Sequence, residues 1–340
     1  MIPYFPKQIA NKGIYIYVGS LVVISLLFRD YAMSWIYLLL NVIWVVGFFS
    51  LSSLFSNKWR ALPPKMFARN VFLVALGLRV LWVVVSYAYY VYATGIPFEF
   101  SAADSLWYYE ESTGNRSASL ATVWNYLFVN TDAISDSGYV FYLSLLSKIT
   151  GESIILPRLV NSALSAFTCV LLYRLAQRNI GEEGGRMTAV FACFVPNLIF
   201  YCGLHLKETV MLFLMVAFLE RSDYLLRSRR YNVWTILVPS LLLISLFTFR
   251  TVLGIAGAFA FATAVVFTNT SIVGRGKRVM LIVWGVVAVL ALAGGVVRNE
   301  VEGLLEDRES NQTAKREMQT ARGNQWAKYA TGTVMAPMMF

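Results

Sequence analysis

The hydrophobic pattern of the chain consists of long apolar runs separated by short polar segments. These runs lie at 14–28, 33–55, 70–94, 154–176, 187–205, 208–222, 232–249, 251–270 and 278–297. A helix needs about 20 apolar residues to cross a bilayer, whereas barrel strands give short alternating segments. Lipid offers the backbone no hydrogen-bond partners, so only helices and closed barrels span it. The pattern therefore predicts an all-α polytopic membrane helical bundle with about nine spans.

Charge is scarce in this chain, and it is clustered. Charged residues make up 14% and hydrophobic residues 58% of the sequence, whereas soluble domains are about one quarter charged. The net charge is +10, but the basic residues fall between the apolar runs. That distribution indicates membrane topology rather than nucleic-acid binding. The cysteines Cys169, Cys193 and Cys202 lie inside predicted spans, so we interpret them as small buried residues, not as metal ligands or a disulfide framework.

Basic residues mark every second loop between the predicted spans. They cluster at 58–69, 174–186, 221–230 and 275–278. Cytoplasmic loops of membrane proteins carry an excess of Lys and Arg. We therefore expect these loops and the N-terminus to be cytoplasmic, in a multi-pass protein of the bacterial inner (plasma) membrane.

The opposite side carries one long acidic loop. Between residues 95 and 137 it has six acids and a single basic residue: Glu99, Asp104, Glu110, Glu111, Asp132 and Asp136 against Arg116. Residues 138–150 follow, apolar but too short to cross, and are predicted to be an amphipathic helix in the outer interface. Three parts result: two additional N-terminal transmembrane helices at 1–56, a core at 57–297 that includes the outer acidic loop at 95–153, and an outer-side charged helical tail at 298–340, expected to be truncated.

The acidic loop holds the first candidate for chemistry. Asp104, Tyr108 and Glu111 are spaced to share one face of a helix, which Ser101 would cap. A carboxylate above a membrane cavity can act as a general base or hold a divalent metal. The alternative is that these acids are solvated loop charges.

A second candidate lies at the outer end of the fifth and sixth predicted spans, where Lys207 and Glu208 follow His205. Ionisable residues at membrane depth indicate function by default, although these three also suit the polar turn of a helical hairpin. His205 is the single histidine, and a lone histidine is more often a hydrogen-bonded interface residue than a base or a ligand.

Arginines at the outer helix ends form a third candidate group. Arg158, Arg250 and Arg298 suit phosphate binding, and snorkelling at helix ends is the alternative for each. Arg79 lies deeper, inside the third predicted span, where a structural ion pair and a functional role are both open. The chain has no P-loop, dinucleotide fingerprint, metalloprotease helix or cysteine metal pattern, which argues against a nucleotide-driven enzyme or pump.

Three stretches of the sequence carry a resemblance to a known family. The first is an outer loop with an Asp followed by aromatics, Asp104–Tyr108. The second is 138–167, an interfacial helix, a Gly, and an Arg and Asn that open the next span. The third is 181–221, a hairpin with Pro196 and an outward acidic turn at Glu208. Over about 70–225, the chain resembles the integral-membrane glycosyltransferases of the GT-C fold, in their family-39-like and mannosyltransferase-like branch.

The resemblance implies an enzyme that transfers a sugar from a polyprenyl-phosphate donor to an envelope lipid, glycan or protein acceptor on the outer side. Asp104 takes the role of general base by this analogy, Glu208 and Lys207 line the same cavity, and Lys207 or Arg158 holds the lipid phosphate. Some branches use a divalent metal. Ser105 occupies the position beside the Asp where the family frequently has a second acid. This difference favours a general base that acts without a metal.

Two other readings remain open from the residues alone. A polymerase or ligase of lipid-linked glycans is one, although such enzymes tend to present Arg-rich outer loops and this loop is acidic. A non-enzymatic transporter or flippase is the other, although the paired halves common in transporters are not found in the sequence.

Overall fold

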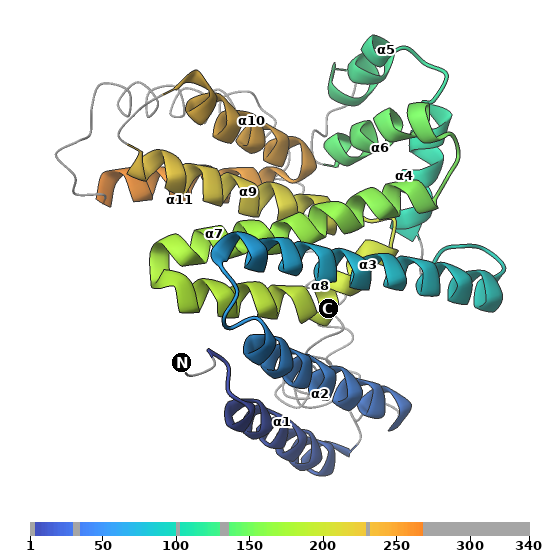
Figure 1. Ribbon diagram of the computed structural model, residues 1–340. Coiled ribbons are helices and arrows are strands. Elements are labelled where there is room, and N and C mark those ends of the chain that lie inside the picture. The colour runs from blue at the N-terminus through green and yellow to red at the C-terminus, as the bar shows by residue number, and fades with distance from the viewer. Residues whose placement is uncertain (1–3, 30–34, 100–102, 130–135, 229–231, 268–340) are drawn as a thin grey trace.

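The computed structural model describes residues 4–29, 35–99, 103–129, 136–228 and 232–267, and this part of the chain is helical without strands. Its helices are α1 (Lys7–Leu27), α2 (Trp35–Lys58), α3 (Pro64–Thr94), α4 (Ala103–Gly114), α5 (Leu120–Trp124), α6 (Ser137–Thr150), α7 (Ile155–Phe194), α8 (Pro196–Phe200), α9 (Glu208–Arg227), α10 (Val233–Phe249) and α11 (Thr251–Phe267). A π-turn, η2 (Asn125–Val129), follows α5, and a 3₁₀ turn, η3 (Tyr201–Gly203), follows α8. The all-α prediction is confirmed for these residues (Figure 1).

In the part of the chain that the structure describes, four helical segments are long and apolar enough to cross a membrane. They are Lys7–Leu27, Leu38–Lys58, Pro64–Thr94 and Ile155–Phe194. Helices α10 and α11 coincide with predicted spans but have 17 residues each, slightly short of the roughly 20 that a crossing needs. The membrane bundle is therefore supported, whereas the nine predicted spans are not confirmed. The span at 278–297, Arg298 and the tail lie outside the described residues.

Helix α7 contains the turn that the sequence places between its fourth and fifth spans. Gly181 has φ 88° and ψ 176°, which is not helical, and the chain reverses there into two arms (Figure 1). Glycine adopts positive φ at little cost, so it suits the reversal. The arms are so close that a Cβ on Gly185 would lie 2.9 Å from backbone atoms of Gln177.

The sequence predicts an unbroken span at 187–205, but the returning arm of α7 stops before Pro196. Proline has no N–H, so the carbonyl four residues earlier, that of Ala192, loses its helical partner. Arg79, fully buried on α3, donates to the carbonyls of Ala192 at 3.1 Å and Cys193 at 3.3 Å. Its Nε also donates to Ser165 Oγ at 2.7 Å. Arg79 thus donates hydrogen bonds to the carbonyl groups at the point where the helix breaks. The ion-pair interpretation is wrong, since these partners are uncharged.

Two arginines of the α7 turn bring several loops to one end of the bundle. Arg186 donates to the carbonyls of Trp59 and Leu62, which join α2 to α3. Arg178 pairs with Glu220 and Asp223 near the end of α9. Three of the basic segments that the sequence assigns to one side therefore meet, and we call this region the basic end. The fourth, at 275–278, lies outside the described residues.

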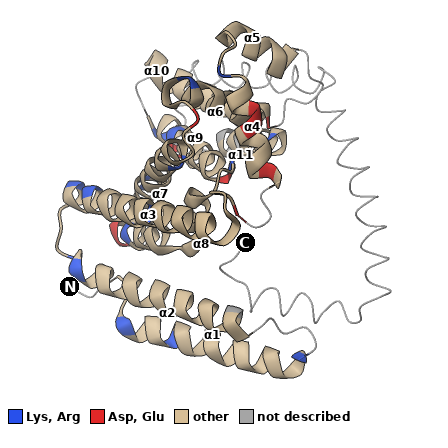
Figure 2. Ribbon diagram, turned by 90° about the vertical axis from the view of Figure 1, so that its right-hand side faces the viewer, with Lys and Arg blue, Asp and Glu red and all other residues tan. Residues whose placement is uncertain are grey.

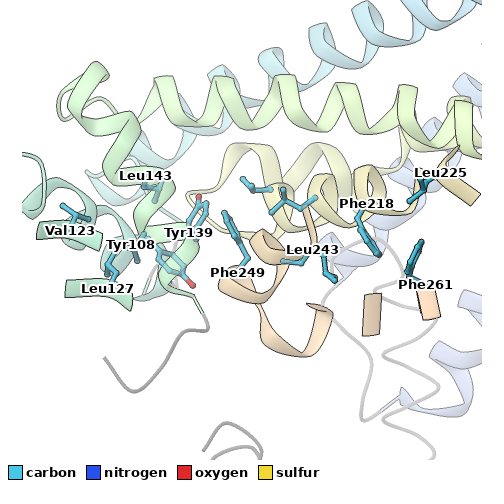
Figure 3. Packing of buried hydrophobic residues seen from close by; sticks show 14 residues of the cluster. Tyr108, Val123, Leu127, Tyr139, Leu143, Phe218, Leu225, Leu243, Phe249 and Phe261 are labelled. Atoms are coloured by element: carbon cyan, nitrogen blue, oxygen red, sulfur yellow. The ribbon is translucent and has the colours of Figure 1, made fainter. Parts of the chain in front are cut away.

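The opposite end is built by α4 and α6, which pack against each other, and α6 also packs against α10 and α7. The predicted interfacial helix at 138–150 is present as α6. Tyr139 on α6 is fully buried, with its ring 4.8 Å from that of Tyr108 on α4 and 6.1 Å from that of Phe249 (Figure 3). This aromatic packing fixes α4 over the bundle.

Helices α1 and α2 form a hairpin at the edge of the molecule (Figure 1). Helix α2 contacts α7, with the rings of Phe48 and Phe191 5.3 Å apart. The backbone N–H of Phe5 donates to Ser56 Oγ at 2.8 Å, which ties the segment before α1 to the end of α2. Both helices lie away from the end that carries α4.

Candidate functional site

Charged residues from four segments meet around the Tyr108 ring on α4. Lys207, just before α9, donates from Nζ to Asp136 Oδ1 and lies 5.9 Å from the Tyr108 ring centroid. The Lys207 side chain is 11% exposed. A cation over an aromatic face is attracted by the ring quadrupole, so Tyr108 and Asp136 together hold the ammonium group in place.

The pKa of Tyr108 shows which other charges lie near its hydroxyl. Burial raises this pKa well above its ordinary value, and the carboxylates of Asp136, Asp104 and Glu208 raise it further. Arg250, at the junction of α10 and α11, lowers it. We call Asp104, Tyr108, Asp136, Lys207, Glu208 and Arg250 the Tyr108 cluster.

The local backbone explains why carboxylates suit these positions. Asp104 lies in the first turn of α4 and Glu208 opens α9. The N-terminus of a helix carries a partial positive charge, which stabilises a carboxylate there. The red segments of the α4 ribbon in Figure 2 mark its acidic residues.

Asp136 is the member of the cluster that the sequence did not single out as a site residue. It precedes α6 with φ 73°, the one positive φ of a non-glycine residue in the described chain. Aspartate tolerates this left-handed conformation better than most residues, but it remains uncommon. A surplus of acids in the loop was the available signal, and nothing in the sequence pairs position 136 with position 207.

A cavity of about 360 Å³ lies beside the cluster and is lined by residues of α7, α8, η3, α9 and α11. Glu208 belongs both to this lining and to the Tyr108 cluster. Its Oε2 is buried and has no hydrogen-bond partner among the described residues. A buried carboxylate oxygen without a partner is costly, so it points to a ligand that donates a hydrogen bond.

Arg158 belongs to a neighbouring buried group rather than to the cluster. Its side chain is fully buried, so snorkelling is wrong for this residue. Nη2 donates to the carbonyl of Pro97 at 2.7 Å, and the guanidinium lies 5.7 Å from the ring centroid of Phe98. Nε and Nη1 have no hydrogen-bond partner in the described part of the chain.

His205 is enclosed in the same buried group. It is 2% exposed, between the rings of Phe98 at 6.4 Å and Tyr109 at 6.0 Å. Burial, and to a smaller extent the positive charge of Arg158, lower the pKa of His205 to about 3. The imidazole is therefore neutral near pH 7, and a shared proton-transfer role with the cluster is not supported by its surroundings.

Glu111 and Ser105 take separate places on α4. Glu111 accepts from Asn115 Nδ2 at 3.5 Å and raises the pKa of the Tyr126 hydroxyl, so its environment is formed by η2. Ser105 is buried and donates to Glu99 Oε1. Tyr108 is buried whereas Asp104 is exposed, so the predicted common face is divided between core and surface. Ser101 and Asp132 lie outside the described residues.

The structure thus brings together Asp104, Tyr108, Lys207, Glu208 and Arg250 and separates them from Glu111, and from Arg158 and His205 in their own buried group. Among the described residues, no group of three or more His, Cys, Asp and Glu is arranged to hold a metal ion, so we name no metal ligand. Comparison of the chain with protein-family models, with curated proteins and with solved structures finds no match.

Proposed function

We propose that the protein is a membrane glycosyltransferase that moves a sugar from a polyprenyl-phosphate donor to an acceptor on the outer side of the membrane. The observation that carries this proposal is the Tyr108 cluster, in which three carboxylates and two cations gather at one end of an apolar helical bundle. The resemblance of residues 70–225 to GT-C glycosyltransferases supports the same reaction.

Sugar transfer from a phosphate donor requires one general base and at least one cation. The acceptor oxygen forms a bond to the anomeric carbon of the sugar, and the bond from that carbon to the phosphate oxygen breaks. The phosphate leaves with the electron pair, while a carboxylate takes the acceptor proton. Asp104 is the predicted base, and Glu208 is the other carboxylate of the cluster that is available for this role, since Asp136 is paired with Lys207.

The cations of the cluster differ in how they are engaged. Lys207 is already paired with Asp136, whereas Arg250 is exposed and has no ion pair among the described residues. A guanidinium binds phosphate oxygens through two parallel hydrogen bonds. We therefore assign the donor phosphate first to Arg250, with Lys207 beside it, and the preorganised positive charge stabilises the leaving phosphate.

The test is transfer of labelled sugar from polyprenyl-phosphate donors into lipid, glycan and protein fractions of membranes that contain the full chain. Asp104→Asn and Glu208→Gln are compared with Glu110→Gln, an exposed acid on the same helix outside the cluster. The transfer rate should fall about 10²–10⁴-fold in the variant whose carboxylate is the general base. Glu110→Gln should keep the rate of the wild type. Absence of transfer from every donor by folded protein refutes the proposal. Full activity in both cluster variants keeps the glycosyltransferase but removes both carboxylates from its site.

Arg250→Gln tests the phosphate assignment separately. Arg227→Gln is its matched control, because Arg227 is an exposed arginine at the basic end. We expect Arg250→Gln alone to weaken donor binding, seen as a higher donor concentration for half-maximal transfer. Equal donor dependence in both variants would remove Arg250 from the site.

A further inference from the structure

The cavity beside Glu208 is apolar over most of its depth. Leu198 of α8, Met211, Leu212 and Met215 of α9, and Leu253 of α11 line it. Its volume of about 360 Å³ lies within the range of about 300–1,000 Å³ that is usual for small-molecule sites. An apolar cavity of this size favours a ligand with a hydrocarbon body.

The charge of the cavity lining indicates which polar group a ligand would have. Glu208 is the charged residue of the lining, and no Lys or Arg of the described chain lines the cavity. Its unpartnered Oε2 would repel a phosphate or carboxylate and attract a hydroxyl donor. The donor phosphate therefore fits the cations of the cluster and not this cavity.

One wall of the cavity is held firmly. Ser165 on α7 accepts from Arg79 Nε at 2.7 Å and donates to the carbonyl of Leu198 at 3.2 Å. Arg79 thereby fixes the position of α8 against α7. Helix α9 contributes Met211 and Met215 to the lining, and their flexible thioether chains adapt to irregular ligands. A lining that combines a fixed segment with adaptable side chains suits ligand chains that differ in length or branching.

We propose that this cavity binds an uncharged lipid alcohol, with its hydroxyl donating to Glu208 Oε2 and its chain lying along Met211, Met215 and Leu253. The inference rests on the proposed function and narrows its acceptor from a lipid, glycan or protein to a lipid alcohol. The alcohol proton passes to Glu208 as the oxygen bonds to the anomeric carbon, and the phosphate departs with the electron pair of the broken bond. Glu208, rather than Asp104, is then the base.

Binding is tested without any sugar donor. The full chain in lipid nanodiscs is irradiated with a long-chain alcohol that carries a photoreactive diazirine, and labelled peptides are identified by mass spectrometry. We expect labelling of the 208–215 segment. An excess of unlabelled alcohol should remove it, whereas the same amount of polyprenyl phosphate should not.

Variants place the labelling inside the cavity. Met215→Trp and Leu253→Phe fill the cavity from α9 and α11, and Glu208→Met removes the carboxylate that accepts the hydrogen bond of the alcohol. We expect each to reduce labelling about tenfold, a change that corresponds to about 1.4 kcal/mol in binding. Leu241→Trp is the matched control, since Leu241 is a lipid-accessible leucine on α10, 53% exposed and outside the lining. Two independent filling variants, each checked for an unchanged melting temperature, guard against misfolding.

The outcomes separate this inference from the proposed function. Labelling that persists in both filling variants, or that polyprenyl phosphate displaces as well as the alcohol does, overturns the alcohol site. Sugar transfer to glycan or protein without alcohol binding overturns the inference but keeps the glycosyltransferase. Specific alcohol binding without transfer from any donor supports the site and overturns its role as an acceptor site. Transfer to the alcohol that is lost in Glu208→Gln and kept in Asp104→Asn supports the whole proposal.

Discussion

The basic end and the Tyr108 cluster use charged side chains in opposite ways. At the basic end, Arg178 pairs with Glu220 at 2.8 Å and Asp223 at 2.9 Å, and Arg186 donates to three backbone carbonyls. At the other end, Glu208 Oε2 and two nitrogens of the neighbouring Arg158 are buried without partners in the described chain.

This difference distinguishes charged groups whose partners lie within the fold from charged groups whose hydrogen-bonding capacity the described chain leaves unused. Buried polar atoms in folded proteins are almost always hydrogen-bonded, so an exception needs an explanation. Saturated arginines at the basic end tie the α7 turn to α2, α3 and α9. The unpartnered atoms near the cluster suit binding of a polar ligand. Substitutions at the two ends should therefore affect stability and activity in opposite proportion.

The largest loss of stability is expected from Arg178→Ala. The Glu220 side chain is 3% exposed, and without Arg178 it keeps only the ion pair with Arg221 at 3.3 Å. Loss of one partner of a buried carboxylate costs about 3 kcal/mol, the lower end of the range for a broken buried pair. Thermal unfolding in detergent should show a clear fall in melting temperature, while sugar transfer per folded molecule stays unchanged. Arg227→Ala is the control, because this arginine is 51% exposed and its pair is worth about 0–1 kcal/mol. Equal melting temperatures for the two variants would contradict the structural role of the basic end.

Arg79→Met comes next in size. The variant leaves the carbonyls of Ala192 and Cys193 without their donor, at about 1–3 kcal/mol for each buried group, offset in part because a charge no longer has to be buried. We expect a net loss of about 1–3 kcal/mol in the free energy of unfolding, measured by urea titration in detergent. Arg79→Lys keeps a donor and should lose less stability than Arg79→Met. Equal losses in the two variants would show that the carbonyl contacts are unimportant.

Patterns within short stretches of sequence predicted much of this molecule. Apolar runs located the helices, and the charge parity of the loops placed the segments around residues 60, 180 and 222 at one end. The expected turn near residue 181 is present because glycine and the flanking polar residues end an apolar run. At the other end, Asp104, Lys207 and Glu208 meet, as the loop assignments implied.

What the sequence left open depends on contacts between distant segments. Lys207 and Asp136 are 71 positions apart, and Arg79 reaches carbonyls 113 and 114 positions away. Pro196 indicated a break in the helix, but not that a cation on α3 would satisfy it. Arg158 was expected at a helix end near water, and its complete burial follows from how the segment around Phe98 folds over it.

The third prediction concerns pH and a buried group beside the cluster. The pKa of His205 is about 3 in the folded protein, against an ordinary value of about 6.5 in the unfolded chain. The unfolded state therefore binds more protons in this window, and stability falls as the pH drops below about 6.5. At about pH 5.5 the cost is about 1.4 kcal/mol, and near pH 7.5 it vanishes.

His205→Gln removes this titration while keeping a polar side chain. Melting temperatures of the wild type and the variant, measured from pH 7.5 downwards, should diverge in slope, with the wild type falling more steeply. Parallel curves would show that His205 is protonated as easily in the folded protein as in the unfolded chain, and that its enclosure by Phe98 and Tyr109 is looser than described.

The smallest effect on stability is expected from Lys207→Met, although this residue lies in the cluster. Its partner Asp136 is 37% exposed, so solvent screens the pair, and such a pair contributes about 0–1 kcal/mol. Transfer should fall far more than stability does, because the variant removes one of the two cations proposed for the leaving phosphate. Asp136→Asn gives the matched test, since it breaks the same pair but keeps the cation.

If Lys207 acts on the phosphate, Asp136→Asn releases it and should retain or improve donor binding, whereas Lys207→Met should weaken it. If the pair serves only to order α6 against α9, both variants should reduce transfer alike, with equal small losses in melting temperature. Donor titrations of the two variants at low and high salt decide between these cases, because a screened pair contributes less as the ionic strength rises. Equal behaviour of the two would place Lys207 with the arginines of the basic end, as a residue of the fold rather than of the site.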